Sequence, residues 1–174
     1  MTVKDKIVFI LCTALMVAGN LRTEWGVTWH CPWWHHLTFH FVHGNIFHLA
    51  GNILVLWLYC KSGKLRVKDW LTAFAIATAF SFAIPSPTPL VGFSGILMYL
   101  YGILIPPIWK NRQVRIATYI FIALSVGSLF FNQWPAVLFH ALCTLAGVLC
   151  YHTQRLIHDI KDHEERTNRR GTGA

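Results

Sequence analysis

Charge is what the chain has least of. Only 13% of its 174 residues are charged, against about 25% in a typical soluble domain. Carboxylates are the scarcer kind, and none occurs between Asp69 and Asp159. The composition therefore argues against an ordinary soluble domain. It also means that a catalytic histidine in the middle of the chain would have no carboxylate close in sequence to orient it.

Paired cysteines are also missing. The five cysteines show no CxxC motif and no paired spacing; they are residues 12, 31, 60, 143 and 150. This pattern argues against a disulfide framework. Four of the five lie in or beside apolar runs, so we expect buried free thiols.

A continuous basic face is absent as well, although the formal net charge is +8. The basic residues fall in short clusters between apolar runs. Such clustering is typical of membrane topology rather than of a nucleic-acid-binding surface. We therefore expect no nucleic-acid partner and a lipid bilayer as the surroundings.

Hydrophobic residues, by contrast, make up 55% of the chain and gather in six apolar runs. The runs cover residues 7–20, 41–60, 69–85, 90–109, 114–131 and 134–152. Most approach the length of about 20 residues with which a helix crosses the hydrocarbon. We predict an all-α membrane protein, with a six-helix transmembrane bundle over residues 1–152 and a basic cytoplasmic tail over 153–174. The first run has an alternative interpretation, a signal peptide ending near Val17-Ala18-Gly19.

The positions of the basic residues predict the orientation of the bundle. If the N-terminus lies inside, every Lys and Arg except Arg22 also lies inside. The positive-inside rule then assigns both termini to the cytoplasm. We expect a multi-pass protein of a bacterial inner membrane.

The first loop, residues 21–40, is rich in Trp and His and poor in charge. Amphipathic rings of this kind favour the headgroup layer of a membrane. We therefore expect its histidines to be interfacial or solvent-exposed; they are His30, His35, His36 and His40. His36 and His40 would share a helical face and could bind a metal weakly.

Three polar side chains share one predicted depth. Ser94, His140 and His48 each lie near the start of a run that begins on the outside. A serine and a histidine are the two groups of a minimal nucleophile–base dyad. Both are costly within hydrocarbon unless they face a partner or a water-filled cavity. The arrangement predicts chemistry within the membrane, with the site open to the outer face.

Smaller residues around these groups fit the same site. Asn52 lies four residues after His48 and shares its helix face. Gly92 and Gly95 flank the serine, and Gly147 follows His140 by two turns on nearly the same face. Small residues let membrane helices approach closely, which would bring Ser94 and His140 into hydrogen-bond range.

Together these motifs resemble the rhomboid family of intramembrane serine proteases. The resemblance spans nearly the whole chain and rests on His43-Gly-Asn-Ile-Phe-His48-Leu-Ala-Gly-Asn52, on Gly92-Phe-Ser94-Gly95, and on the late His140 with Gly147. It implies a rhomboid-like six-helix fold and substrates that are transmembrane proteins. It implies no cofactor and no metal.

The resemblance also implies roles for single residues. Ser94 would be the nucleophile, and His140 the general base and then the general acid. The oxyanion hole would comprise His48, Asn52 and the backbone N–H of Ser94. Supporting positions would be His43, Gly92, Gly95 and Gly147.

The chain departs from the family pattern at three points. The first loop has no Arg after Arg22, whereas many members carry a Trp-Arg pair there. Met98 occupies a position at which some bacterial members have Tyr, and Cys143 one at which Gly is frequent. The departures concern the shape of the first loop and the packing around His140.

Two other functions stay open from the sequence. One is a proteolytically inactive relative that binds membrane-protein clients. The other is a membrane haem or metal protein that uses His48 and His140 as ligands. Substrate identity and oligomeric state are not determined by the sequence, and the fifth run is our hypothesis for the helix that moves to admit substrate.

Overall fold

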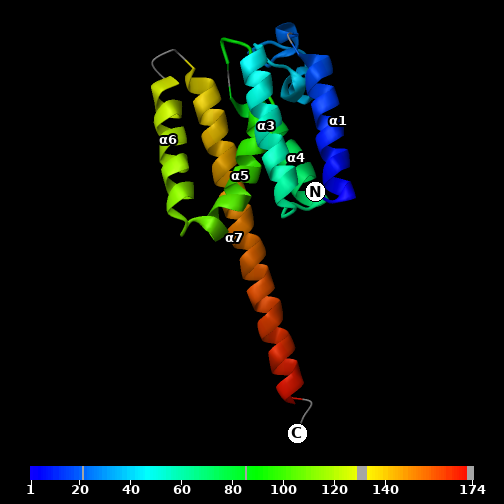
Figure 1. Ribbon diagram of the computed structural model, residues 1–174, viewed down its shortest axis with the longest axis vertical. Helices are drawn as coiled ribbons and strands as arrows, with labels where there is room; N and C mark the ends of the chain where they lie inside the picture. The colour runs from blue at the N-terminus through cyan, green and yellow to red at the C-terminus, as the bar shows by residue number, and fades with distance from the viewer. Residues whose placement is uncertain (21, 85, 129–132, 172–174) are drawn as a thin grey trace.

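The computed structural model describes residues 1–20, 22–84, 86–128 and 133–171, and over these ranges it is helical, with one isolated β-bridge. In chain order the elements are α1 (Val3–Gly19), η1 (Thr23–Trp25), α2 (His35–Thr38), η2 (Phe39–Phe41), α3 (Ile46–Ser62), α4 (Val67–Ala83), α5 (Ser94–Ile108), α6 (Arg112–Ser128) and α7 (Trp134–Gly171). The long helices alternate in direction, so both termini point towards the same end of the bundle (Figure 1). The fold is thus an all-helical bundle, as the sequence predicts.

Local side-chain chemistry sets where α3 begins and ends. The carboxamide of Asn45 accepts the backbone N–H of His48 at 2.8 Å and caps the first turn. At the other end Gly63 has a φ of 64°, which glycine adopts without strain. α3 therefore begins at Ile46, five residues after the start of the second apolar run.

The fourth apolar run also starts before its helix. α5 begins at Ser94, whereas the run begins at residue 90. Gly92 has a φ of 119°, a backbone conformation that is not helical and that residues other than glycine rarely adopt. Residues 90–93 consequently precede the helix, with a turn at Phe93, and Ser94 is the first helical residue.

α5 lies at the centre of the bundle and packs most closely on α7. A Cβ atom on Gly147 would lie 2.0 Å from the backbone oxygen of Tyr99, and one on Gly102 would lie 2.2 Å from that of Thr144. Glycine at both positions thus allows the two backbones to touch. This contact fixes the depth of one helix against the other.

Polar contacts join three helices at the end opposite the first loop. Lys4 Nζ donates to the backbone oxygen of Leu65 at 3.1 Å, and Arg66 pairs with Asp69 at 3.1 Å. Arg66 also donates to the side chain of Gln154 on α7. The starts of α1 and α4 and the middle of α7 are therefore held together there.

Helix lengths bear on membrane crossing. Among the described helices, one stretch of α7 (Trp134–Arg166) is by itself long and apolar enough to cross a membrane. The segment α2–η2 and helix α3 meet the same criterion only if they are taken together as one span with an 85° bend. α1, α3, α4 and α6 have 17 residues each. At about 1.5 Å per residue such helices span about 26 Å, close to the hydrocarbon thickness of about 30 Å.

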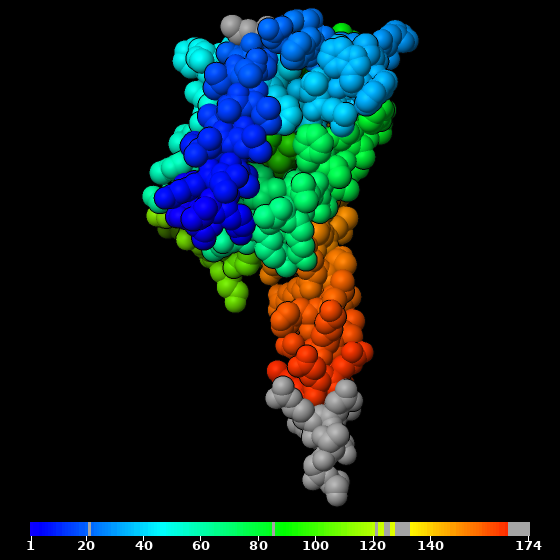
Figure 2. Space-filling view, turned by 90° about the vertical axis from the view of Figure 1, so that its right-hand side faces the viewer, coloured from blue at the N-terminus to red at the C-terminus, as the bar shows by residue number. Residues whose placement is uncertain are grey.

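α7 does not stop where the last apolar run ends. It continues without a break to Gly171, so the boundary we predicted between residues 152 and 153 lies inside one helix. Beyond the bundle the helix projects alone (Figures 1 and 2). Predictions for Pro85, residues 129–131, Asn132 and residues 172–174 concern positions outside the described ranges.

The cysteines are free, as predicted, but only some are buried. Cys60 and Cys143 are buried, whereas Cys12, Cys31 and Cys150 are partly exposed. Of the four thiols in or beside apolar runs, burial is confirmed for Cys60 and Cys143 and wrong for Cys12 and Cys150.

Candidate active site

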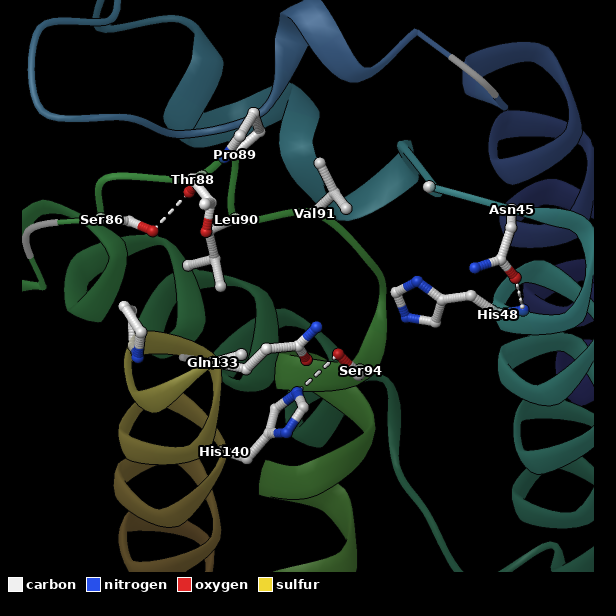
Figure 3. Close-up of a pocket in the computed structure, with 13 residues that line it drawn as sticks. Asn45, His48, Ser86, Thr88, Pro89, Leu90, Val91, Ser94, Gln133 and His140 are labelled. Carbon is white, nitrogen blue, oxygen red and sulfur yellow. Dashed lines mark hydrogen bonds between the residues drawn. The ribbon is translucent and has the colours of Figure 1, made fainter. Parts of the chain in front are cut away.

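A cavity of about 410 Å³ opens at the end of the bundle that carries the first loop. We call it the Ser94 cavity; its walls are Gly44, Asn45, His48, Ser86, Thr88, Pro89, Leu90, Val91, Ser94, Gln133, Pro135, Ala136 and His140. Figure 3 shows that the side chains of His48 and His140 approach Ser94 from two different helices. Polar groups from distant parts of the sequence thus share one cavity.

Ser94 and His140 are directly hydrogen-bonded. Ser94 Oγ lies 2.7 Å from His140 Nε2. Ser94 opens α5 and His140 lies on the second turn of α7, beside Phe139. A Cβ atom on Gly95 would lie 2.2 Å from the Phe139 ring, so only glycine allows this approach. An imidazole at this distance can accept the hydroxyl proton and activate the oxygen as a nucleophile.

The start of α5 adds positive potential at the same point. The first N–H groups of a helix have no acceptor within the helix, and the helix dipole is positive at that end. Ser94 is the first residue of α5, and Leu97 is the first whose N–H bonds back, to the oxygen of Phe93. Backbone N–H groups next to Ser94 Oγ are therefore suited to stabilise negative charge on a nearby oxygen.

His48 lies across Gly92 from the serine. A Cβ atom on Gly92 would lie 2.8 Å from His48 Nε2 and 3.4 Å from Ser94 Oγ. Any side chain at residue 92 would therefore occupy the space between the two groups. His48 can donate a hydrogen bond into the cavity from this position.

Asn52 and His43 lie behind the cavity wall. Asn52 is 6% exposed, is not among the residues that line the cavity, and its Nδ2 has no hydrogen-bond partner in the structure. His43 is fully buried, and its ring packs edge-on against that of His48 with 5.0 Å between centroids. His43 thus supports the orientation of His48, while a direct role for Asn52 stays a prediction.

The chain that leads into Ser94 is held by the first loop. Val27 and Leu90 exchange two backbone hydrogen bonds at 3.0 and 2.9 Å. The N–H of Gly92 donates to the oxygen of Phe39 at 2.9 Å. The first loop therefore positions the nucleophile, although it contributes no residue to the cavity wall.

Three histidines of the first loop are buried, so our expectation that they would be interfacial or exposed is wrong. His35 bonds the backbone oxygen of Gly26, His36 bonds Ser81 Oγ at 2.8 Å, and His40 bonds Thr78 Oγ1 at 2.9 Å. Ser81 and Thr78 both belong to α4. Hydroxyls on α4 thus bond one ring nitrogen each of His36 and His40, while Nδ1 of His40 is buried without a partner in the structure.

Burial also changes the chemistry of these rings. Desolvation lowers the pKa of His40 to about 3, so its imidazole is neutral at physiological pH. His36 and His40 turn to separate hydroxyls and do not share a ligand. In the described ranges no group of three or more His, Cys, Asp or Glu side chains is arranged to hold a metal ion.

Several cavity residues were not predicted from the sequence. Gln133 immediately precedes α7, and its carboxamide lies beside Ser94 and His140 (Figure 3). Leu90 and Val91 form the wall on the approach to α5. The only available signal was position, since each of these residues lies within a few residues of a predicted helix start on the outside.

The sequence model of the Rhomboid domain family matches residues 30–150, which contain all the residues of the Ser94 cavity. No curated protein matches the chain significantly.

Proposed function

The chain belongs to the rhomboid family of integral membrane proteins, and we propose that it is an active serine-type endopeptidase. It would hydrolyse peptide bonds in or next to the transmembrane segments of other membrane proteins. The observation that carries the proposal is the 2.7 Å hydrogen bond between Ser94 Oγ and His140 Nε2 in an open cavity. Members of the family are in general serine proteases, which supports the same chemistry.

The reaction follows from the positions of these two groups. His140 Nε2 accepts the hydroxyl proton of Ser94 as Oγ attacks the scissile carbonyl carbon. The imidazolium then donates this proton to the leaving amine, and an acyl-enzyme remains on Ser94. Water, activated by the same imidazole, releases the acyl group and restores the serine.

Stabilisation of the tetrahedral intermediate is assigned to groups around Ser94. Its backbone N–H and the ring of His48 are the two donors nearest to the developing oxyanion in our proposal. Asn52 lies one turn further along α3, and its unpartnered Nδ2 is available to bond a water or a substrate group if the wall opens. We assign Asn52 a secondary role.

The arrangement in the membrane is also part of the proposal. α1 and α3 to α7 would be six spans, with α2 and η2 as part of an outer loop and both termini in the cytoplasm. The charge pattern supports this orientation, because every Lys and Arg except Arg22 then lies on the inside. The Ser94 cavity would open to the outer face of a bacterial inner membrane.

Substrate would enter by movement of α6. This helix is joined to α5 by a hydrogen bond between Tyr101 and Thr118. An apolar cavity of about 430 Å³ lies between α6 and α7 and reaches His140. A transmembrane segment of a substrate could replace α6 contacts along this cavity.

The test is labelling of the purified protein with a fluorophosphonate, followed by cleavage of a transmembrane reporter. Ser94→Ala and His140→Ala should each lose the label and reduce cleavage by about 10⁶-fold, as is typical when a serine hydrolase loses its nucleophile or base. The matched control is Ser62→Ala, at the far end of α3, which should keep both. Cleavage retained in both dyad variants would refute the proposal, and a folded wild type that takes no label would favour an inactive, client-binding relative.

A further inference from the structure

A second pocket is lined by residues of the first loop and of the end of α4, two segments that lie against each other in Figure 2. We call it the Cys31 pocket; it has a volume of about 330 Å³ and is lined by Val27, Thr28, Trp29, Cys31, His36, Ser81, Phe82 and Ile84. It shares no lining residue with the Ser94 cavity. The pocket contains a thiol, an imidazole and a hydroxyl that the proposed proteolysis does not use.

These three groups form a directed chain. The hydroxyl of Ser81 donates to the backbone oxygen of Thr78 at 2.7 Å. Because the hydroxyl proton is used in that bond, Ser81 Oγ can only accept a hydrogen bond from the ring of His36, whose Nδ1 lies 2.8 Å away. The proton of the neutral imidazole is thus on Nδ1, and the lone pair of Nε2 faces Cys31 Sγ at 3.7 Å.

The imidazole is held rigidly and kept neutral. The ring of His36 stacks on Phe82 with 3.6 Å between centroids and 15° between planes, and the residue is 8% exposed. Burial, and secondarily the charge of His35, lowers the pKa of His36. The titratable groups that face the His36 ring are Cys31 and His35. The contacts from α4 come from Ser81 and Phe82, which do not titrate. A neutral, oriented imidazole can accept a thiol proton.

We propose that Cys31, with His36 as its base and Ser81 as the residue that fixes the tautomer, is a second nucleophilic site that exchanges with small apolar disulfides. His36 Nε2 takes the thiol proton, and the Cys31 thiolate attacks one sulfur of the disulfide. The disulfide S–S bond breaks as the Cys31–S–S–R bond forms. The leaving thiolate takes the proton from His36, so no further oxidant is needed.

The pocket determines the class of reagent. Cys31 is partly exposed, so a reagent can reach the sulfur without unfolding of the loop. Beside the three reacting groups and Thr28, the walls consist of aliphatic and aromatic side chains, with Trp29 60% exposed. The described lining contains no Lys, Arg, Asp or Glu that would favour a charged disulfide. A small, neutral, aromatic disulfide fits this chemistry.

The experiment measures the reaction of 4,4′-dithiodipyridine with the full-length protein, by the absorbance of the released thiopyridone and by peptide mapping of the adduct. A free cysteine is only a few per cent thiolate at pH 7. Base assistance should make Cys31 react about fivefold faster at pH 7 in the wild type than in His36→Asn, after allowance for the lower nucleophilicity of a more acidic thiol. Asparagine can still donate a hydrogen bond to Ser81, but it has no nitrogen at the position of Nε2 to accept the thiol proton.

The pH dependence separates base assistance from simple access. In alkaline solution hydroxide removes the proton of an accessible thiol without a neighbouring base, so the two rates should converge as the pH is raised. A variant that merely opens the pocket would instead differ from the wild type at every pH. Cys150, the partly exposed thiol on α7, is the internal control and should react equally in both proteins. Cys31→Ser should remove the fast phase.

A second variant keeps the proposal testable if His36→Asn loosens the fold, which a faster reaction at Cys150 would reveal. Ser81→Ala leaves the imidazole in place but removes the acceptor for Nδ1–H, so it should slow Cys31 at pH 7 in the same direction. Equal rates in wild type and Ser81→Ala, or a Cys31 that reacts only after denaturation, would overturn the proposal.

Discussion

Replacement of Gly147 by alanine should damage catalysis without touching a catalytic group. The new Cβ would lie 2.0 Å from the backbone oxygen of Tyr99, about 1.4 Å inside the 3.4 Å at which ordinary contact begins. Neither partner is the end of a flexible side chain, so α7 must move away from α5. His140 lies two turns earlier on the same helix and moves with it.

The expected magnitude follows from the geometry of the dyad. A shift of about 1 Å in a catalytic group can reduce the rate by about 10²-fold. The separation of 2.7 Å between Ser94 Oγ and His140 Nε2 would exceed hydrogen-bond range if most of that movement reached His140. We expect kcat to fall by about 10²-fold, and overpacking to reduce stability by about 1–3 kcal/mol.

Gly51→Ala is the matched control for this substitution. Gly51 also lies inside a helix, but a Cβ there would meet nothing within 4 Å. Alanine at this position should preserve activity and raise stability slightly, because glycine is the poorer helix former by about 0.5–1 kcal/mol. The assay is cleavage of a transmembrane reporter together with thermal unfolding of both variants. Equal kcat values for Gly147→Ala and Gly51→Ala would refute the argument that the α5–α7 contact sets the dyad.

Two further predictions concern histidines. His48→Ala should lower kcat by about 10²–10³-fold with little change in KM, as expected for loss of an oxyanion donor. Asn52→Ala should lower kcat by less, because Asn52 does not line the cavity. Steady-state kinetics of both variants check this, and a larger loss of kcat in Asn52→Ala would contradict the assignment. Acid should destabilise the fold through His40, whose pKa is about 3 in the folded protein and 6.5 in an unperturbed imidazole. Above pH 6.5 His40 is neutral in both states and does not change the free energy of unfolding with pH. As the pH falls from 6.5 towards 3, His40 is protonated in the unfolded chain but not in the folded one, so the free energy of unfolding drops by up to about 1.4 kcal/mol per pH unit. Thermal unfolding across this window should be less pH-dependent in His40→Gln, and an equal slope would contradict the prediction.

The sequence predicted which segments are helical better than where they begin. Apolar runs mark the helices, because burial or lipid contact requires apolar surface along each of them. The helices α3 and α5 start later than their apolar runs. Hydrophobicity alone does not show that Asn45 caps α3 or that Gly92 has a positive φ before α5. α7 continues past its run since polar residues can extend a helix through pairs such as Arg155 with Asp159.

The candidate site was predictable where it depends on depth along the helices. Ser94 and His140 lie near the starts of two runs that begin at the same end, and their side chains are hydrogen-bonded in the structure. The histidines of the first loop were not predictable in this way. Burial of His36 and His40 depends on Ser81 and Thr78, which lie 45 and 38 residues further along the chain. Such non-local partners leave no local pattern in the sequence.

The unbroken length of α7 has a mechanical consequence. Its 38 residues form a rod about 57 Å long, with His140 near one end and the tail at the other. The tight contact of Gly147 with Tyr99 lies between them and acts as a fulcrum. We therefore expect a load on the tail, such as a bound molecule or a fused tag, to shift the imidazole, because the helix has no break between the two. An attachment at the N-terminus should disturb the Ser94–His140 pair less than one on this tail.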